Sequence, residues 1–189
     1  MGGRQVAAGL LGASVLALLL APTGLPDDYS WNAHTLSEAA AQGVPGAWVA
    51  RVGLALLGAG VLVLAGWADR WGPGGRVLHG LFGGCLVASA VLPTRSWVKT
   101  AAFDPTLDTL HSIAATVMGF AFAFGVVTVA VAQRRRRALD VASVAASVLL
   151  PLGMMVVPEL AGLLQRAMFG TAYLWFGSEL VSRPPESPP

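Results

Sequence analysis

The side chains that could carry out chemistry gather in three short stretches of an otherwise apolar chain of 189 residues. The first stretch ends at residues 34–38, the second covers residues 104–111, and the third surrounds residue 166. Imidazole, carboxylate and guanidinium groups can together transfer protons, ligate a metal or hold a charged ligand. We therefore predict one binding pocket with these candidate residues: His34, Glu38, Asp104, Asp108, His111 and Arg166.

The three carboxylates among these candidates also have a structural explanation. Thr35-Leu36-Ser37-Glu38 fits a capping box, in which Thr35 caps a short helix and Glu38 bonds back to its amide. Asp104 or Asp108 could cap the helix that begins near His111 and stabilise its positive end. The residues alone leave capping and binding open for these acids.

Arg166 is harder to explain as a surface residue. It lies seven residues after Glu159, which is about 10 Å deeper along a helix at 1.5 Å per residue. An ionisable group at that depth is costly unless it is paired or wetted. We expect an ion pair with one of four acids, with His34 and His111 bordering the same cavity: Glu38, Asp104, Asp108 or Glu159.

His34 and His111 are the only pair of histidines that could share a metal, because both lie at the same end of the predicted helices. With nearby carboxylates they could supply three ligands and leave a fourth position for a hydrolytic water. The chain has no His-Glu-x-x-His pattern. Haem is not expected, because His79 follows Arg76 and lies at the opposite end. No cofactor is predicted, and a metal stays an open alternative.

Six apolar segments must position these side chains. Hydrophobic residues make up 55% of the chain and charged residues 12%, about half the charged share of a soluble domain. Each segment approaches the length that spans a bilayer, although the third and fifth are short. We predict an all-α bundle of six transmembrane helices over residues 6–21, 48–67, 77–92, 111–132, 141–157 and 160–181.

Four consecutive arginines orient this bundle: Arg134, Arg135, Arg136 and Arg137. Short loops rich in arginine face the cytoplasm. Alternation then places eight basic residues and both termini inside, and acidic residues such as Asp28 and Glu159 outside. We predict a multi-pass protein of the plasma membrane, in contact with the lipid bilayer. The four arginines are foremost a topogenic signal, with binding of anionic lipid headgroups as the alternative.

Other features complete the predicted organisation. Leu20-Ala21-Pro22 is a poor cleavage site, so residues 6–21 are expected to stay as the first helix. Residues 1–182 form one transmembrane domain, and the Pro-rich residues 183–189 are expected to be a disordered cytoplasmic tail. Residues 72–75 predict a tight turn, and Gly80-x-x-x-Gly84 predicts close packing of the third helix on a neighbour.

These features resemble the family catalogued as domain of unknown function 998, six-helix membrane proteins found mainly in bacteria and archaea. The resemblance rests on three motifs: His34-Thr35-Leu36-Ser37-Glu38, Leu107-Asp108-Thr109-Leu110-His111 and Gly162-Leu163-Leu164-Gln165-Arg166. In this family an acid often follows the Pro-x that closes the third helix. Here Leu92-Pro93-Thr94-Arg95 carries arginine, so Asp104 or Asp108 is expected to replace that acid. The resemblance implies the architecture and the site's location but no reaction.

The residues leave three function classes open. The favoured class is a non-catalytic binding or accessory membrane protein with an outward-facing polar pocket. The alternatives are a membrane-embedded hydrolase of a lipid or small amphiphile, and a structural subunit that binds another membrane protein. Whether the chain is an enzyme is left open. The net charge of +2 is small and lies in loops, so no nucleic-acid partner is expected.

Overall fold

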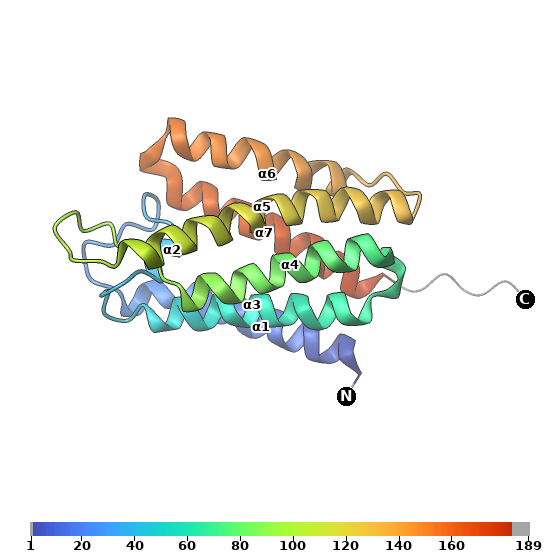
Figure 1. The fold of residues 1–189 in the computed structure, drawn as a ribbon, viewed down its shortest axis with the longest axis horizontal. Coiled ribbons are helices and arrows are strands. Elements are labelled where there is room, and N and C mark those ends of the chain that lie inside the picture. Colours follow the sequence, from blue (N-terminus) through green and yellow to red (C-terminus); the bar gives the residue numbers. More distant parts are fainter. Residues whose placement is uncertain (1, 183–189) are drawn as a thin grey trace, which may run out of the picture.

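Six long helices run antiparallel along one axis in the computed structural model, which describes residues 2–182 (Figure 1). The described chain is all-α, and short 3-10 turns cover Ala21–Gly24, Asp69–Trp71 and Pro158–Leu160. The predicted tail of residues 183–189 lies outside the described residues. The α-helices are α1 (Gly3–Leu20), α2 (Leu36–Ala39), α3 (Trp48–Trp67), α4 (Gly72–Val91), α5 (Pro105–Ala132), α6 (Ala138–Val156) and α7 (Ala161–Val181).

Five of the long helices are long and apolar enough to cross a membrane: α1, α3, α4, α5 and α6. Large apolar side chains such as Phe124 and Leu149 are exposed on the outside of the bundle, as expected of surfaces that face lipid. The sixth long helix, α7, has 21 residues but carries Arg166 and Glu179. The prediction of six spans is therefore supported by hydropathy for five helices, and the chain has the character of a multi-pass membrane protein.

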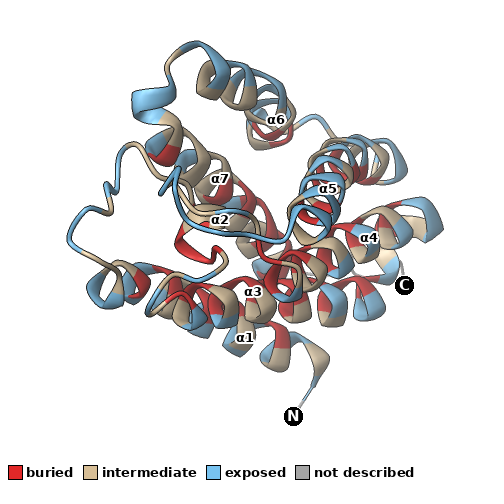
Figure 2. Cartoon of the chain, turned by 60° about the vertical axis from the view of Figure 1, so that its left-hand side comes forward, coloured by how far each residue is buried: buried red, intermediate tan, exposed pale blue. Residues whose placement is uncertain are grey.

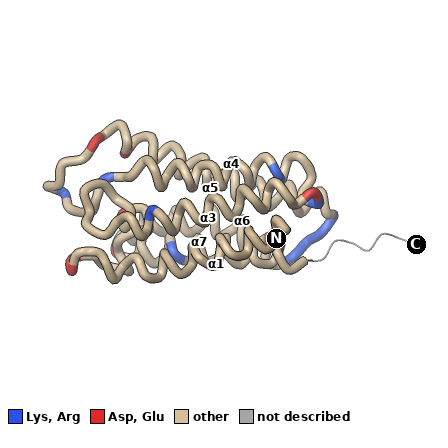
Figure 3. The backbone as a smooth tube through the Cα atoms, turned by 90° about the horizontal axis from the view of Figure 1, so that it is seen from below, with Lys and Arg blue, Asp and Glu red and all other residues tan. Residues whose placement is uncertain are grey.

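The bundle has two chemically different ends. The start of α1, the end of α7 and the α3–α4 and α5–α6 connections lie together, and we call this the arginine end (Figure 1). The connections at residues 21–47, 92–104 and 157–160 lie at the other end, the loop end. Figure 3 shows the charged residues in the two end regions, with a long blue stretch at the arginine end. This separation is what a membrane-spanning bundle requires, because charges are costly in hydrocarbon.

Successive helices pack side by side, α1 on α3, α3 on α4, α4 on α5 and α6 on α7. Helix α7 also returns to α1, where the Ser14 hydroxyl donates to the Gly53 carbonyl oxygen at 2.6 Å and lies 2.5 Å from the Tyr173 hydroxyl. Half of the span in α3 is buried, compared with 11% of the span in α6. Helix α3 is therefore central, whereas α6 lies at the periphery and meets the bundle mainly through α7 (Figure 2).

The core contains the third histidine. His79 is fully buried, and its ring centroid lies 4.7 Å from that of Trp71 and 4.6 Å from that of Trp175. Gly125 makes room for the imidazole, because a Cβ there would lie 2.7 Å from a ring carbon of His79. His79 is thus part of the aromatic core near the arginine end, well away from His34 and His111.

The glycine prediction for α4 is wrong in its choice of face. Nothing lies within 4 Å of a Cβ built on Gly80 or Gly84. The close approach runs instead through Gly83 and Gly58 of α3: a Cβ on Gly58 would lie 2.6 Å from the Gly83 carbonyl oxygen, and one on Gly83 would lie 2.8 Å from the Gly58 carbonyl oxygen. Helices α3 and α4 therefore touch backbone to backbone, the kind of contact that drives helix association in lipid.

The predicted turn at residues 72–75 is also displaced. The chain reverses within Asp69–Trp71, and α4 already begins at Gly72. Gly72 has a φ of 65°, which is accessible to glycine. Pro73 follows in the first turn of the helix, where the missing amide hydrogen costs nothing.

Candidate functional site

The short helix α2 at the loop end is held by the predicted capping box. The Thr35 hydroxyl accepts a hydrogen bond from the Glu38 amide at 3.1 Å. Glu38 Oε2 accepts from the Thr35 amide at 2.7 Å and from the Thr35 hydroxyl at 2.9 Å. Glu38 thus has a structural role through one carboxylate oxygen, and within residues 2–182 its other oxygen has no hydrogen-bond partner.

The expectation that Arg166 forms an ion pair is wrong for the described residues. Arg166 Nη1 donates to the carbonyl oxygens of Trp31, His34 and Gly162 at 2.7, 2.9 and 2.9 Å. Its Nη2 donates to the Tyr29 hydroxyl, and its guanidinium carbon lies 4.4 Å from the centroid of the Trp31 ring. No carboxylate among the described residues is within ion-pair distance of Arg166. Backbone carbonyls of the first loop satisfy this charge, because the loop folds down onto α7.

Other contacts fix the same loop on α7. The Leu163 amide donates to the Asn32 carbonyl at 2.9 Å, and Gln165 Oε1 accepts from the Leu36 amide at 2.6 Å. Gly162 is required here, because a Cβ would lie 2.3 Å from the His34 carbonyl oxygen. Burial raises the pKa of the Tyr29 phenol, although Arg166 opposes this, so Tyr29 stays neutral and accepts from Arg166. Arg166 therefore positions the loop that carries His34.

The two predicted aspartates also hold loops. Asp104 caps α5 by accepting from the amides of Thr106 and Leu107 at 2.7 and 3.2 Å. Asp108 Oδ1 accepts from the Thr94 hydroxyl at 2.7 Å and from the Arg95 amide at 2.9 Å. Asp108 Oδ2 also lies 3.9 Å from the Arg95 guanidinium, so Asp108 holds the Thr94–Arg95 segment against α5.

A cavity of about 570 Å³ opens at the loop end, and we call it the loop-end cavity. Of the six candidates, His34, Glu38 and His111 line it, whereas Asp104, Asp108 and Arg166 do not. The other lining residues include Arg95 and Trp97. The His34 ring stacks on Trp97 with centroids 4.9 Å apart, and the Arg95 side chain is 67% exposed. The structure thus brings three predicted residues into one cavity and uses the other three to support its walls.

Hydrogen bonds determine what the two histidines offer to the loop-end cavity. His34 Nδ1 accepts from the Ser30 amide at 2.9 Å, so a neutral His34 carries its proton on Nε2 and can donate. His111 Nδ1 lies 2.8 Å from the Leu92 carbonyl oxygen, an acceptor, so Nδ1 carries the proton and Nε2 can accept. With the Arg95 guanidinium and the Glu38 carboxylate, the cavity presents both donors and acceptors.

A second, apolar cavity of about 410 Å³ lies between α5, α6 and α7, and we call it the helix cleft. It reaches the buried Leu54 of α3 and Leu86 of α4, so it penetrates to the centre of the bundle. Ser37 and Ala115 line both the helix cleft and the loop-end cavity. A polar chamber at the loop end is therefore adjacent to an apolar chamber at the depth of the membrane.

The metal alternative has little support in this geometry. No group of three His, Cys, Asp or Glu side chains within residues 2–182 is arranged to hold a metal ion. His34, Glu38 and His111 line one cavity, but within the described part of the chain they are not grouped closely enough to hold one metal ion.

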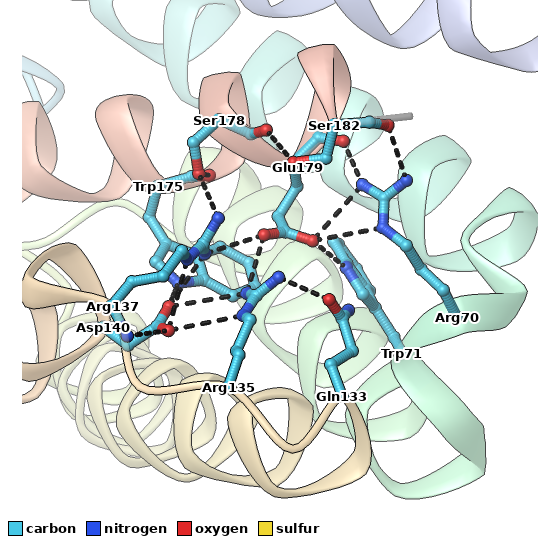
Figure 4. A network of polar contacts seen from close by, with 10 residues as sticks. All are labelled: Arg70, Trp71, Gln133, Arg135, Arg137, Asp140, Trp175, Ser178, Glu179 and Ser182. Carbon is cyan, nitrogen blue, oxygen red and sulfur yellow. Dashed lines mark hydrogen bonds and ion pairs between the residues drawn. The ribbon is translucent and has the colours of Figure 1, made fainter. Parts of the chain in front are cut away.

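Sequence reasoning missed a buried ionic network at the arginine end (Figure 4). Glu179 is fully buried, and its Oε1 accepts from Arg135 at 2.7 Å and Arg137 at 2.8 Å. Its Oε2 accepts from the Trp71 indole at 2.8 Å and lies 3.3 Å from Arg70. One carboxylate near the end of α7 therefore ties together the α3–α4 and α5–α6 connections.

Asp140 is the second acid of this network. It accepts from Arg137 at 2.8 Å, from the Trp175 indole at 2.9 Å and from Arg135 at 3.3 Å (Figure 4). Burial alone would lower the pKa of Arg137, but its hydrogen bond to Asp140 and the charge of Glu179 raise it. One signal of this network is present in the sequence. Trp175 and Glu179 are about one helical turn apart, near the end of the sixth predicted helix, which the predicted topology places on the same side of the membrane as the four arginines.

Comparison with known proteins identifies a family. The family model described as "Protein of unknown function (DUF998)" matches residues 6–178, nearly the whole bundle. No curated protein and no solved structure matches the chain.

Proposed function

The chain belongs to the DUF998 family of proteins of unknown function, and on that premise we propose that it is a membrane protein that binds an amphiphile. The head group of this amphiphile occupies the loop-end cavity, and its apolar chain occupies the helix cleft. The observation that carries the proposal is that the two cavities share Ser37 and Ala115 as lining residues. A ligand with a polar and an apolar part can therefore fill both at once.

The topology that goes with this function has six spans, with both termini and the arginine end in the cytoplasm. Helix α7 is the sixth span, because it packs along α6 and has 21 residues, about 30 Å at 1.5 Å per residue. The arginine-rich α5–α6 connection supports the cytoplasmic orientation of its end. In the plasma membrane the loop-end cavity then opens toward the exterior.

The loop-end cavity suits a head group that both accepts and donates hydrogen bonds. His34 Nε2 and the exposed Arg95 guanidinium can donate to a phosphate, carboxylate or hydroxyl oxygen. His111 Nε2 and the free oxygen of Glu38 can accept from a hydroxyl or ammonium group. The mixture of one cation and one anion favours a zwitterionic or hydroxyl-rich head group over a multiply charged one.

The helix cleft suits the apolar part of the ligand. Its lining is mostly apolar, with side chains such as Met118, Phe169 and Met154. Both cavities have volumes within the range of about 300–1,000 Å³ that is typical of small-molecule sites. The peripheral position of α6 gives a ligand a lateral path from the bilayer into the helix cleft.

A second candidate function is hydrolysis of such an amphiphile. It is favoured by one observation, the tautomer of His111, whose Nε2 can act as a base in the loop-end cavity. Release of a fatty acid or head group from an ester amphiphile, lost in His111→Gln, would support this function. Binding of the amphiphile without release of a hydrolysis product would support the binding function instead.

Photocrosslinking tests the proposed binding function. We expect a diazirine-labelled lysophospholipid to label residues 115–123 of α5 and 147–154 of α6 in the purified protein. Ala115→Trp should block the junction of the two cavities and reduce this labelling several-fold. Ile113→Trp, at a 55% exposed position of the same helix, is the matched control and should leave it unchanged. Uniform labelling of all lipid-facing helices would contradict the proposal.

A further inference from the structure

A groove between α5 and α6 at the arginine end shares no lining residue with the loop-end cavity. We propose that it holds one anionic phospholipid, whose phosphate lies on Arg134 and Arg136 and whose acyl chain lies along valines of α5 and α6. This arginine groove has a volume of about 770 Å³. The proposal does not depend on the proposed function, because the two sites share no residue.

The four arginines divide into two pairs with different partners. Arg135 and Arg137 point inward and are neutralised by Glu179 and Asp140. Arg134 and Arg136 are exposed, and within residues 2–182 their guanidinium groups have neither an ion pair nor a hydrogen bond. Arg134 and Arg136 therefore have no carboxylate partner among residues 2–182, and Asp140, which also lines the arginine groove, is paired with Arg135 and Arg137.

The loop that carries these charges is held in place. Arg134 adopts a φ of 48°, and the Arg135 amide donates to the Ala130 carbonyl oxygen at 3.0 Å, which closes a tight turn after α5. The buried pairs of Arg135 and Arg137 anchor both sides of Arg136. The two free guanidinium groups are thus presented from a fixed backbone, which lowers the entropic cost of binding a phosphate.

The walls of the arginine groove select a lipid over a soluble anion. Val127 and Val131 of α5 and Val141 of α6 line it and are 45%, 71% and 67% exposed. Val131 precedes Arg134 by three residues at the end of α5, and Val141 lies in the first turn of α6, so the apolar walls begin next to the loop that carries the free charges. A phospholipid provides this combination, since its phosphate sits directly above its acyl chains.

Lipid binding to the purified full-length protein in detergent tests the proposal, measured by native mass spectrometry. We expect phosphatidylglycerol to bind at least about tenfold more tightly than phosphatidylcholine, because its headgroup carries a net negative charge next to Arg134 and Arg136 and that of phosphatidylcholine does not. Arg134→Gln with Arg136→Gln should abolish this preference. The control variant, Arg4→Gln with Lys99→Gln, removes the same amount of charge at exposed positions elsewhere and should keep the preference for phosphatidylglycerol.

A second pair of variants tests the acyl site without changing charge. Ala145→Trp fills the arginine groove and should weaken binding of phosphatidylglycerol, whereas Ala142→Trp, exposed on α6 but outside the groove, should not. Equal affinity for the two lipids in the unmodified protein, or a preference that survives in the double arginine variant, would overturn the proposal. Full competition by glycerol phosphate at millimolar concentration would overturn its acyl part.

Discussion

At the scale of single residues, Glu179 determines the chemistry of the arginine end. It faces Arg70, Arg135 and Arg137, and it is fully buried. A buried carboxylate costs desolvation energy that several arginines and an indole together can offset. Removing it leaves Arg70 without a carboxylate partner among the described residues and Arg135 and Arg137 with Asp140 alone. This loss is more costly than losing an exposed ion pair.

Glu179→Gln should therefore destabilise the protein strongly. The expected cost is about 3–5 kcal/mol, the usual effect of breaking a buried ion pair by removing one partner. The apparent Tm in detergent should fall well below that of the unmodified chain. Glu159→Gln, at an exposed position of the loop end, serves as the control and should leave Tm unchanged. If the two variants have the same Tm, the network contributes little to stability.

Residue-scale predictions from the sequence succeeded where the partners are close in the chain. The capping box of Thr35 and Glu38 spans three residues, and Asp104 caps through the next amides, so both follow from local rules. Most partners of Arg166 and Glu179 are distant in the sequence: Trp31 is 135 residues from Arg166, and Arg135 and Trp71 are 44 and 108 residues from Glu179. No periodicity encodes such contacts, and the carbonyls that hold Arg166 belong to residues of any type.

At the scale of elements, hydropathy predicted where the helices lie in the sequence, but it did not predict which face of a helix packs on its neighbour. The predicted segments agree with the long helices within a few residues at most ends, because lipid requires continuous apolar helices. Helix α4 carries glycines at positions 80, 83 and 84, so composition alone does not determine which side meets α3. The structure selects Gly83, whose backbone faces Gly58.

Gly83→Leu should separate α3 from α4, whereas Gly84→Leu should be tolerated. A side chain at position 83 meets the Gly58 carbonyl oxygen at 2.8 Å, but nothing lies within 4 Å of a Cβ at position 84. Overpacking of this kind costs about 1–3 kcal/mol or more. Thermal unfolding of the two variants in one detergent measures the difference. A larger loss of stability in the Gly84 variant would mean that α4 is rotated from the orientation described.

At the scale of the whole molecule, the separation of polar groups to two ends organises both proposed sites. The loop end combines a mixed-charge cavity with the helix cleft, and the arginine end combines two free cations with an apolar groove. Both apolar spaces lie along α5 and α6, where the weakly buried α6 leaves the bundle open. This seam is the part of the molecule best suited to admit lipid-like ligands.

The proposed orientation predicts the result of topology mapping. A reporter fused after residue 183 should lie in the cytoplasm, and one inserted next to Asp28 should lie outside, since the arginine-rich connection stays inside. Cysteine accessibility in intact cells provides an independent readout at the same positions. A C-terminus and an Asp28 loop on the same side of the membrane would contradict six spans.

The most direct test of amphiphile binding is a density map of the protein purified with its native lipids. We predict an elongated density in the helix cleft, between Met118 of α5 and Phe169 of α7. Its wider end should pass Ser37 and Ala115 and lie within hydrogen-bond distance of His34, Arg95 or His111. The proposed function would be contradicted if side chains close the helix cleft. It would also be contradicted if bulk lipid fills the cleft and the loop-end cavity holds only water.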